Sequence, residues 1–246
     1  MKRLFDIVFS FAGLLVMSPI LWVFVLLIWL QDRHHPFYIA PRVGRHGKTF
    51  RMVKLRSMIV GADKSGVDST ADSDKRITWA GHVIRRYKLD ESSQLWNVLR
   101  GDMSLVGPRP NVQREVDLYT DEERHLLDMR PGITDLASIV FSDEGDILAG
   151  SEDPDLMYNQ VIRPWKSRLG LLYVKERTFL LDLHIIWLTV IALLSRPRTL
   201  CGVQRILRRL GADTQLLTAT SRKEPLQPYP PPGSDRIVES RAPGSS

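Results

Sequence analysis

The chain has 246 residues, a formal net charge of +6 and one cysteine. That length allows one domain with a real core and some appendages. The surplus of positive charge favours an anionic partner, such as nucleic acid, a membrane surface or a phosphorylated substrate. The single Cys201 excludes an intrachain disulfide, which fits a reducing compartment, and we interpret it as a structural residue.

The first long segment is strongly apolar. Residues 7–30 read IVFSFAGLLVMSPILWVFVLLIWL and carry no charge. A helix of that length rises about 36 Å, enough to cross a hydrocarbon core about 30 Å thick. The run is too long for a signal peptide, and QDRHHP follows it instead of a small-residue cleavage site. We therefore predict membrane insertion, with His34 and His35 at the interface.

Two features leave open whether this helix spans the bilayer. Basic residues flank both ends, and the positive-inside rule is satisfied if both ends stay cytoplasmic. Pro19 removes an amide donor and clashes with the carbonyl of Leu15, which favours a kink or break. The Ser18 hydroxyl could satisfy a carbonyl freed in this way. Composition alone fits a kinked spanning helix and a re-entrant helix hairpin equally well.

The next segment combines a strand with a loop. Turn signals at Pro41, Gly44 and Gly47 precede a short extended run at residues 50–55. Residues 60–74 are polar and rich in Gly, Asp and Ser, which predicts a mobile loop.

Helices are predicted to follow. Residues 78–87 predict a short basic helix, and Asp90 is predicted to begin and cap another helix that ends near Leu99, before Gly101. After the rigid turn LVGPRP, residues 112–128 predict a further helix that RPGIT ends.

The last third of the chain contains one apolar segment, one basic segment and a polar tail. Residues 178–194 are apolar but too short for a full span, and they carry Asp182 and His184, which predicts an interfacial or core helix. Residues 204–211, QRILRRLG, predict a basic amphipathic helix that lies on anionic lipid or in solvent. From residue 221 onward the chain is rich in Pro, Ser and Gly, which predicts disorder.

Candidate chemistry centres on one acid pair and the cations around it. The chain has no Walker A loop, no GxGxxG and no Cys/His cluster with zinc spacing. A second acidic patch at residues 143–146 is interpreted as a solvated loop. Asp90 and Glu91 stand at a helix start, where an acid is also an ordinary cap.

Four cations accompany this pair. Lys54 and Arg56 alternate, which places them on one strand face, Arg85 lies five residues before Asp90, and Arg109 lies between two prolines. Arginine binds phosphate oxygens in pairs and lysine supplies a compact charge, so this set predicts a polyphosphate site. Two carboxylates beside polyphosphate suit Mg²⁺.

A family resemblance is carried by VKLRSM, LDESSQLWNVLRGDMSLVGPRP and RPGIT, in this order, behind an apolar helix with a central Ser-Pro. From Lys2 to Ser195 the chain resembles the bacterial sugar transferases, small monotopic phosphoglycosyl transferases that act on polyprenyl phosphate. The resemblance implies transfer of sugar-1-phosphate from a nucleotide diphosphate sugar, usually UDP-linked, to polyprenyl (undecaprenyl) phosphate with release of UMP. It implies the first membrane step of O-antigen, capsule, exopolysaccharide or glycoprotein glycan synthesis.

The resemblance also implies roles for residues. Asp90 matches the family's nucleophile, and Glu91 matches its partner associated with Mg²⁺. Lys54, Arg85 and Arg109 match motif cations that look like phosphate contacts, and Arg56 and Gln94 are predicted as further phosphate or substrate contacts. Ser18 and Pro19 match the family's helix break, which favours the re-entrant topology at the bacterial inner membrane with the catalytic domain on the cytoplasmic face.

The expected fold is α+β, predominantly helical with a small β element, an N-terminal re-entrant membrane helix hairpin and amphipathic interfacial helices. The expected parts are a re-entrant membrane helix at 1–35, a catalytic domain at 36–200, a basic amphipathic segment at 201–220 and a disordered tail at 221–246.

The chain departs from the common family pattern in two places. Ser92-Ser93 replaces Leu-Pro, and the segment Asp135–Gly150 lacks an arginine that many members have. The second departure suggests different donor handling, in which Glu144 takes part.

Two alternatives to this function are considered. An inactive membrane scaffold of a glycan-assembly pathway is disfavoured by the intact acid pair, and a nucleic-acid binder by the lack of a recognised motif. The sugar, the nucleotide and the oligomeric state stay open.

Overall fold

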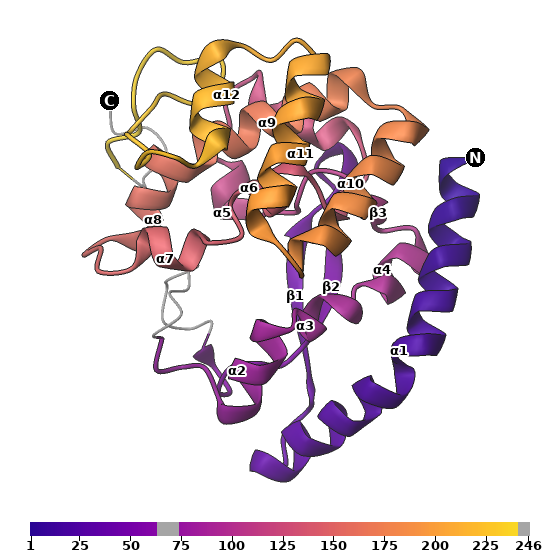
Figure 1. Cartoon of the computed structure of the whole chain (residues 1–246). Helices are drawn as coiled ribbons and strands as arrows, with labels where there is room; N and C mark the ends of the chain where they lie inside the picture. Colours follow the sequence, from indigo (N-terminus) through magenta and orange to yellow (C-terminus); the bar gives the residue numbers. More distant parts are fainter. Residues whose placement is uncertain (63–73, 241–246) are drawn as a thin grey trace.

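The computed structural model describes residues 1–62 and 74–240. The chain is mainly helical with two small two-stranded sheets, which confirms the predicted helix-rich α+β class (Figure 1). The predicted loop at 60–74 lies mostly outside the described residues. The elements are α1 Lys2–Asp32, β1 Phe37–Val43, the 3₁₀ turn η1 Arg45–Gly47, β2 Thr49–Leu55, α2 Trp79–Arg86, α3 Leu89–Ser92, α4 Leu95–Arg100, β3 Ser104–Val106, α5 Gln113–Val116, the 3₁₀ helix η3 Glu123–Asp128, β4 Gly132–Thr134, α6 Leu136–Val140, α7 Glu144–Leu148, α8 Pro154–Met157, the π-helical turn η4 Tyr158–Ile162, α9 Arg163–Glu176, α10 Phe179–Ala192, α11 Arg196–Arg209 and α12 Thr214–Ser221.

Helix α1 lies along one side of the molecule and bends near its middle (Figure 1). Pro19 lies inside it, and the Ser18 hydroxyl donates to the carbonyl of Leu15 at 2.8 Å, as predicted for the carbonyl that proline frees. Within the described residues, α1 alone is long and apolar enough to cross a membrane. It is one bent helix rather than two antiparallel arms, so the re-entrant topology stays a prediction.

The first turns of α1 are fastened to the rest of the protein by polar side chains. Lys2 Nζ lies 2.6 Å from a carboxylate oxygen of Asp182 in α10. Asp6 is buried and accepts a hydrogen bond of 2.9 Å from the hydroxyl of Ser104 in β3. Buried polar groups need such partners, so this end of α1 is built to pack on the folded domain.

The last turn of α1 is fastened as well. Arg56, directly after β2, donates from both terminal nitrogens to the two carboxylate oxygens of Asp32, at 2.5 and 2.6 Å. Its Nε donates to the carbonyl of His35 at 2.9 Å. Both ends of α1 therefore belong to the same folded body as β1 and β2.

Two sheets carry the sequence motifs. β1 and β2 form an antiparallel hairpin in which Tyr38 pairs with Lys54, which confirms the predicted extended run at 50–55. β3 and β4 are parallel, and a Cβ on Gly132 would lie 2.1 Å from the backbone nitrogen of Gly107. This close approach requires glycine and brings RPGIT against VGPRP.

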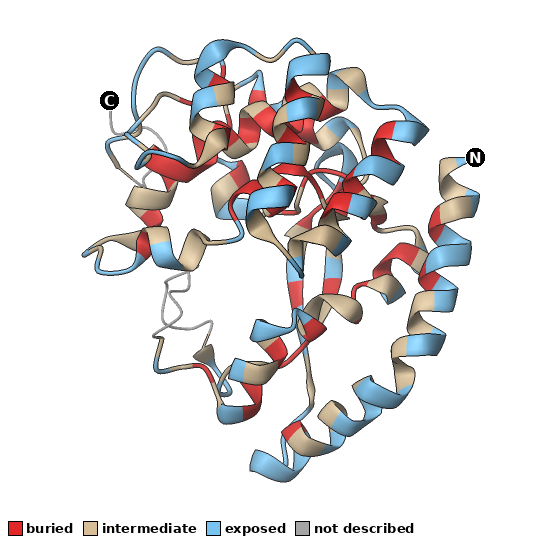
Figure 2. Cartoon of the chain, in the orientation of Figure 1, coloured by how far each residue is buried: buried red, intermediate tan, exposed pale blue. Residues whose placement is uncertain are grey.

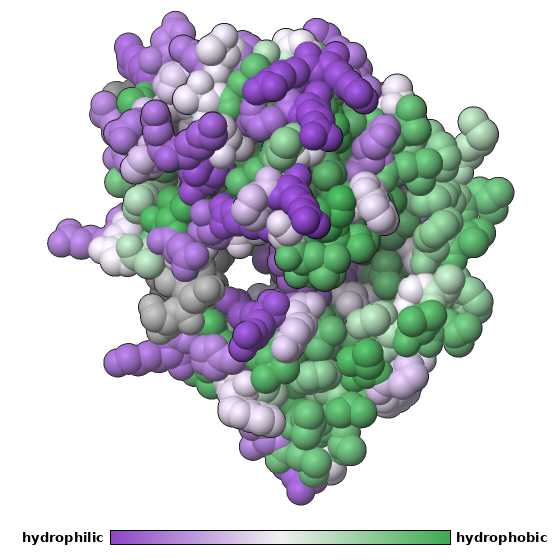
Figure 3. Space-filling model, viewed as in Figure 1, coloured by the Kyte–Doolittle hydropathy of each residue, from purple (hydrophilic) through white to green (hydrophobic). Residues whose placement is uncertain are grey.

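The main core lies between α6, α9, α10 and α11, and a second cluster joins α1 to β2, α2 and α3. Figure 2 shows many buried residues in the first group of helices and few along α1. The large side chains along the outer face of α1 are exposed and apolar, and they cover that side of the molecule (Figure 3).

Helix α10 fits both predicted environments. Ile185 and Leu188 are buried in the core, whereas Leu180 and Trp187 are exposed. Its contact with lipid stays a prediction. Val203 and Leu207 of helix α11 pack into the core, and contact of this basic segment with lipid stays a prediction.

The structure corrects the local structure predicted for residues 112–128 and for the tail. Residues 112–128 form the short α5 and η3 instead of one helix. They separate at Thr120, because Thr120 and Glu123 cap each other's backbone N–H groups and Glu123 turns inward to Arg163. The tail is not disordered over residues 222–240, which lack regular structure but pack on the domain; the last six predicted tail residues lie outside the described residues.

Candidate active site

The acid pair lies in the single turn α3, which begins after Lys88 in the left-handed conformation (φ 52°). No side chain caps this turn, so Asp90 is not the predicted cap and its carboxylate is not occupied by backbone N–H groups. The predicted helix at 90–99 is divided into α3 and α4, and α4 ends at Gly101 (φ 92°) as predicted.

Ser93 fixes α3 onto β2. Its buried hydroxyl lies 2.8 Å from the carbonyl of Asp90 and 3.1 Å from the carbonyl of Val53, next to Lys54. The serine that replaces proline in this motif therefore joins the acid pair to the strand that carries the lysine. Gln94 is also buried, and in the described part of the chain its Nε2 has no hydrogen-bond partner.

Three of the predicted cations gather around the acids. Lys54 Nζ lies 4.0 Å from Asp90 Oδ2, and Arg109 Nη2 donates to Glu91 Oε1 at 2.6 Å. Arg85 reaches from α2, where its Nε donates to the hydroxyl of Ser57 at 3.2 Å. The structure thus brings together residues that are up to 55 positions apart in the sequence, although their catalytic roles stay predictions.

Asp90 lines a cavity of about 420 Å³. This is the size of cavity that small ligands occupy. The walls combine cations with apolar side chains from β1, β2 and the segment after β2. The lining cations are Arg42, Lys54, Arg56, Arg76 and Arg85, and the apolar residues are Phe37, Leu55, Met58, Ile59, Val60 and Ala62.

Two of these cations, Arg42 and Arg76, were not predicted as site residues. Arg42 could have been found, because Gly44 and Gly47 predict a hairpin turn that puts it on the same face as Lys54. Arg76 lies outside any motif and gave no signal. Arg56 was predicted to contact phosphate, but its guanidinium is occupied by Asp32.

Burial and charge shift the ionisation of the site. Burial, and then Arg109, lower the pKa of Lys54 to about 8. Burial raises the pKa of Asp90, because it outweighs the attraction of Lys54. Burial also acts upward on the pKa of Glu91, but Arg109 and Lys54 outweigh it and hold that pKa below its ordinary value.

The acid pair suits a metal ion that takes most of its ligands from the substrate and from water. Within the described residues no group of three His, Cys, Asp or Glu side chains could hold a metal by itself. Arg109 binds Oε1 of Glu91, and Oε2 has no hydrogen-bond partner among the described residues. Mg²⁺ is usually held by one or two carboxylates plus phosphate oxygens, which matches this donor set.

The second acidic patch is not a solvated loop. Asp143 accepts from Arg196 at 2.6 Å and from Arg222 at 3.0 Å, and Glu144 pairs with Lys166. Asp143 therefore ties the unusual segment Asp135–Gly150 to α11 and to the chain after α12. Cys201 is exposed on α11 instead of packing in the core.

Comparison with known proteins gives the family. The family model described as "Bacterial sugar transferase" matches residues 1–196. A Bacillus subtilis protein provisionally named an undecaprenyl-phosphate N-acetylgalactosaminyl 1-phosphate transferase is 46% identical over 133 residues, which are 54% of this chain and 70% of that protein.

Two longer relatives cover more of the chain. The undecaprenyl-phosphate galactose phosphotransferase of Salmonella typhimurium is 34% identical over 80% of this chain and 41% of its own length. The UDP-N-acetylgalactosamine-undecaprenyl-phosphate N-acetylgalactosaminephosphotransferase of Aeromonas hydrophila is 32% identical over 79% and 44%. The match thus spans less than half of these two relatives. The chain belongs to the bacterial sugar transferase family.

Proposed function

We propose that the protein transfers a sugar-1-phosphate from a UDP-sugar to polyprenyl phosphate and releases UMP. The observation that carries this proposal is the position of Asp90, a carboxylate that lines a ligand-sized cavity together with Lys54 and Arg85. The names of the Salmonella and Aeromonas relatives support the lipid acceptor, and the latter supports a UDP donor.

The reaction proceeds in two displacements at one phosphorus atom. An oxygen of the Asp90 carboxylate forms a bond to the sugar-bearing phosphorus, and the bond from that phosphorus to the bridging oxygen breaks, so UMP leaves with both bonding electrons. A phosphate oxygen of the polyprenyl phosphate then attacks the same phosphorus. The bond to Asp90 breaks, the carboxylate is restored, and the product is a polyprenyl diphosphate sugar.

The neighbouring cations suit the charge that moves in these steps. Lys54 faces Asp90 and would neutralise the oxygens of the transferred group, while Arg85 extends the positive wall of the cavity. Arg109 holds Glu91 ionised beside the nucleophile. Mg²⁺ bound at Glu91 would supply further charge neutralisation at the phosphates.

We also propose that α1 enters the cytoplasmic leaflet of the inner membrane and returns to the same side. A spanning helix separates its ends by about 30 Å of hydrocarbon. Lys2 and Asp6 at one end, and Asp32 at the other, are bonded instead to one folded body. The bend at Pro19 and the apolar outer face support shallow insertion, which would place Asp90 near the lipid phosphate.

The test is UMP release from a panel of UDP-sugars with undecaprenyl phosphate and Mg²⁺. Asp90→Asn should abolish UMP release and the covalent phosphosugar adduct detected by intact-protein mass spectrometry. Asp121→Asn, which changes a fully exposed acid, is the matched control and should keep activity. Full activity of Asp90→Asn would rule out the mechanism, and binding of UDP-sugar without turnover by the unaltered protein would favour the inactive scaffold.

A further inference from the structure

The residues that follow α12 form an extended segment, which we call the strap (residues 222–240). The strap lies beyond the part of the chain that the family model matches. The backbone N–H of Tyr229 donates to the carbonyl of Gln160 at 2.9 Å, and the Gln160 side chain donates to the carbonyl of Val238 at 2.8 Å. Backbone groups of the strap are therefore paired with the η4 turn that leads into α9.

An aromatic and cationic clamp holds the middle of the strap. The ring of Tyr229 lies 4.5 Å from the ring of Trp165, and the guanidinium of Arg168 lies 4.8 Å from the Tyr229 ring. Arg168 also donates to the carbonyl of Pro230 at 3.0 Å. Such contacts bind a preformed extended segment with little loss of chain entropy, because proline has already restricted it.

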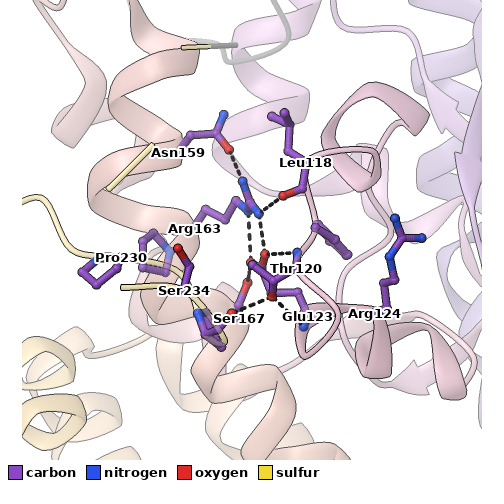
Figure 4. A network of polar contacts seen from close by, with 12 residues as sticks. Leu118, Thr120, Glu123, Arg124, Asn159, Arg163, Ser167, Pro230 and Ser234 are labelled. Carbon is purple, nitrogen blue, oxygen red and sulfur yellow. Dashed lines mark hydrogen bonds and ion pairs between the residues drawn. The ribbon is translucent and has the colours of Figure 1, made fainter. Parts of the chain in front are cut away.

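The strap then reaches a buried ion pair through Thr120. The Thr120 hydroxyl donates to the carbonyl of Pro232 at 2.5 Å and accepts from the N–H of Glu123 at 3.1 Å. Glu123 and Arg163 are almost completely buried and form an ion pair, and Ser167 donates to Glu123 at 2.6 Å. Figure 4 shows this network, with Pro230 and Ser234 of the strap beside it.

The ion pair in turn supports the wall that carries Arg109. The Arg163 guanidinium lies 5.5 Å from the ring of Tyr119, and the Tyr119 hydroxyl accepts from Asn111 at 2.8 Å. Arg109, two residues before Asn111, lines a small cavity of about 40 Å³ together with Tyr119 and Arg163. Arg109 then binds Glu91 of the acid pair.

We propose that the strap is a positioning element of the active site, which holds Arg109 against Glu91 through Thr120, the buried ion pair and Tyr119. This inference rests on the proposed transferase function. A group that is misplaced by about 1 Å can cost about a hundredfold in rate, so loss of a support several contacts away should cost about tenfold in kcat. The effect should fall on kcat more than on KM, because Arg109 acts on the acid pair and not on the walls of the larger cavity.

The experiment compares chains that end at Ser221 and at Ser240. The shorter chain lacks the strap, and the longer one keeps every strap contact described above. We expect about a tenfold loss of kcat in the shorter chain and none in the longer one. A synthetic peptide of residues 222–240 added to the shorter chain should restore part of the loss, and full activity of the shorter chain would overturn the proposal.

Point variants decide the matter if the shorter chain does not fold. Thr120→Val keeps the shape of the side chain but removes the hydroxyl, and Thr120→Ser keeps the hydroxyl, so only the first should lower kcat. When Arg109→Lys is combined with Thr120→Val, the loss of kcat in the double variant, expressed as free energy, should be smaller than the sum of the two single losses, since Thr120 acts through Arg109. Strictly additive losses would mean that the strap stabilises the fold without positioning Arg109.

A measurement that does not depend on catalysis distinguishes failure of the strap proposal from failure of the proposed transferase function. If the full chain releases no UMP, the proposed function fails, and hydrogen exchange then tests the strap. Amides of residues 118–126 should exchange faster in the chain that ends at Ser221 than in the one that ends at Ser240. Equal exchange in both chains would contradict the proposed support.

Discussion

The ionisation of Lys54 predicts how the reaction depends on pH. Burial and Arg109 lower its pKa to about 8, and the protonated form is the one that can neutralise phosphate. The rate should therefore fall as pH rises through about 8. With that pKa, about a tenth of the lysines stay protonated one pH unit higher, so kcat/KM should be about tenfold lower at pH 9 than on the plateau.

The acid limb has the opposite origin. In the proposed mechanism Asp90 must be ionised to attack, and burial raises its pKa above the ordinary value, so the rate should fall as pH decreases through that raised value. The complete profile should be bell-shaped. Because kcat/KM reports the free enzyme, it is the quantity to measure, by UMP release at fixed ionic strength.

Lys54→Arg separates this explanation from others. Arginine stays charged at every accessible pH, so the alkaline fall near pH 8 should disappear while the acid limb remains. Lys54→Met should be slow at all pH values and should also lack the alkaline fall. An alkaline fall that persists in Lys54→Arg, or a flat profile up to pH 10 in the unaltered protein, would refute the assignment.

Two further predictions concern α1. Arg56→Ala should lower the free energy of unfolding, measured by thermal unfolding, by about 2 kcal/mol, which is less than for a fully buried pair because Asp32 is partly exposed. The same change should leave kcat, measured by UMP release, within about twofold. A raised KM with unchanged stability would instead support the original prediction that Arg56 binds phosphate. Single cysteines placed before residue 7 and after residue 30, in a Cys201→Ser background, should both react with a membrane-impermeant thiol reagent from the cytoplasmic side. Labelling from opposite sides would exclude the re-entrant topology.

Structure that has a local cause could be predicted from the sequence. Pro19 removes one donor and the preceding serine replaces it, and both facts can be read from adjacent residues. The run at 50–55 and the stop at Gly101 follow from side-chain type and backbone preference. The acid pair and its cations were found together because the motifs that carry them are distinctive, although the structure was needed to bring them within contact.

Structure that depends on a partner distant in the sequence could not be predicted. Residues 112–128 have helical composition, but Glu123 pairs with Arg163, which lies 40 residues later, and that burial is incompatible with one continuous surface helix. The strap has the composition of a disordered segment, yet Tyr229 packs on Trp165. A compositional rule measures whether a segment can build its own core, and the strap uses a core that already exists.

In the proposed mechanism, a covalent intermediate formed in the cavity at Asp90 would explain how substrates of unlike solubility can share one site. A UDP-sugar is a water-soluble anion, whereas a polyprenyl phosphate cannot leave the bilayer. Both present the same chemistry to the protein, an oxyanion of phosphorus, and the cavity offers cations beside Asp90 together with apolar walls from Phe37 and Ile59.

If Asp90 holds the phosphosugar after UMP has left and before polyprenyl phosphate binds, the two substrates do not have to be bound at the same time. The site then needs only one set of phosphate contacts. A direct transfer would need the attacking polyprenyl phosphate and the leaving UMP in line at the same phosphorus, and hence anion contacts on two opposite sides of it. Lys54 lies 4.0 Å from Asp90 and Arg109 is occupied by Glu91, an arrangement that suits the stepwise route.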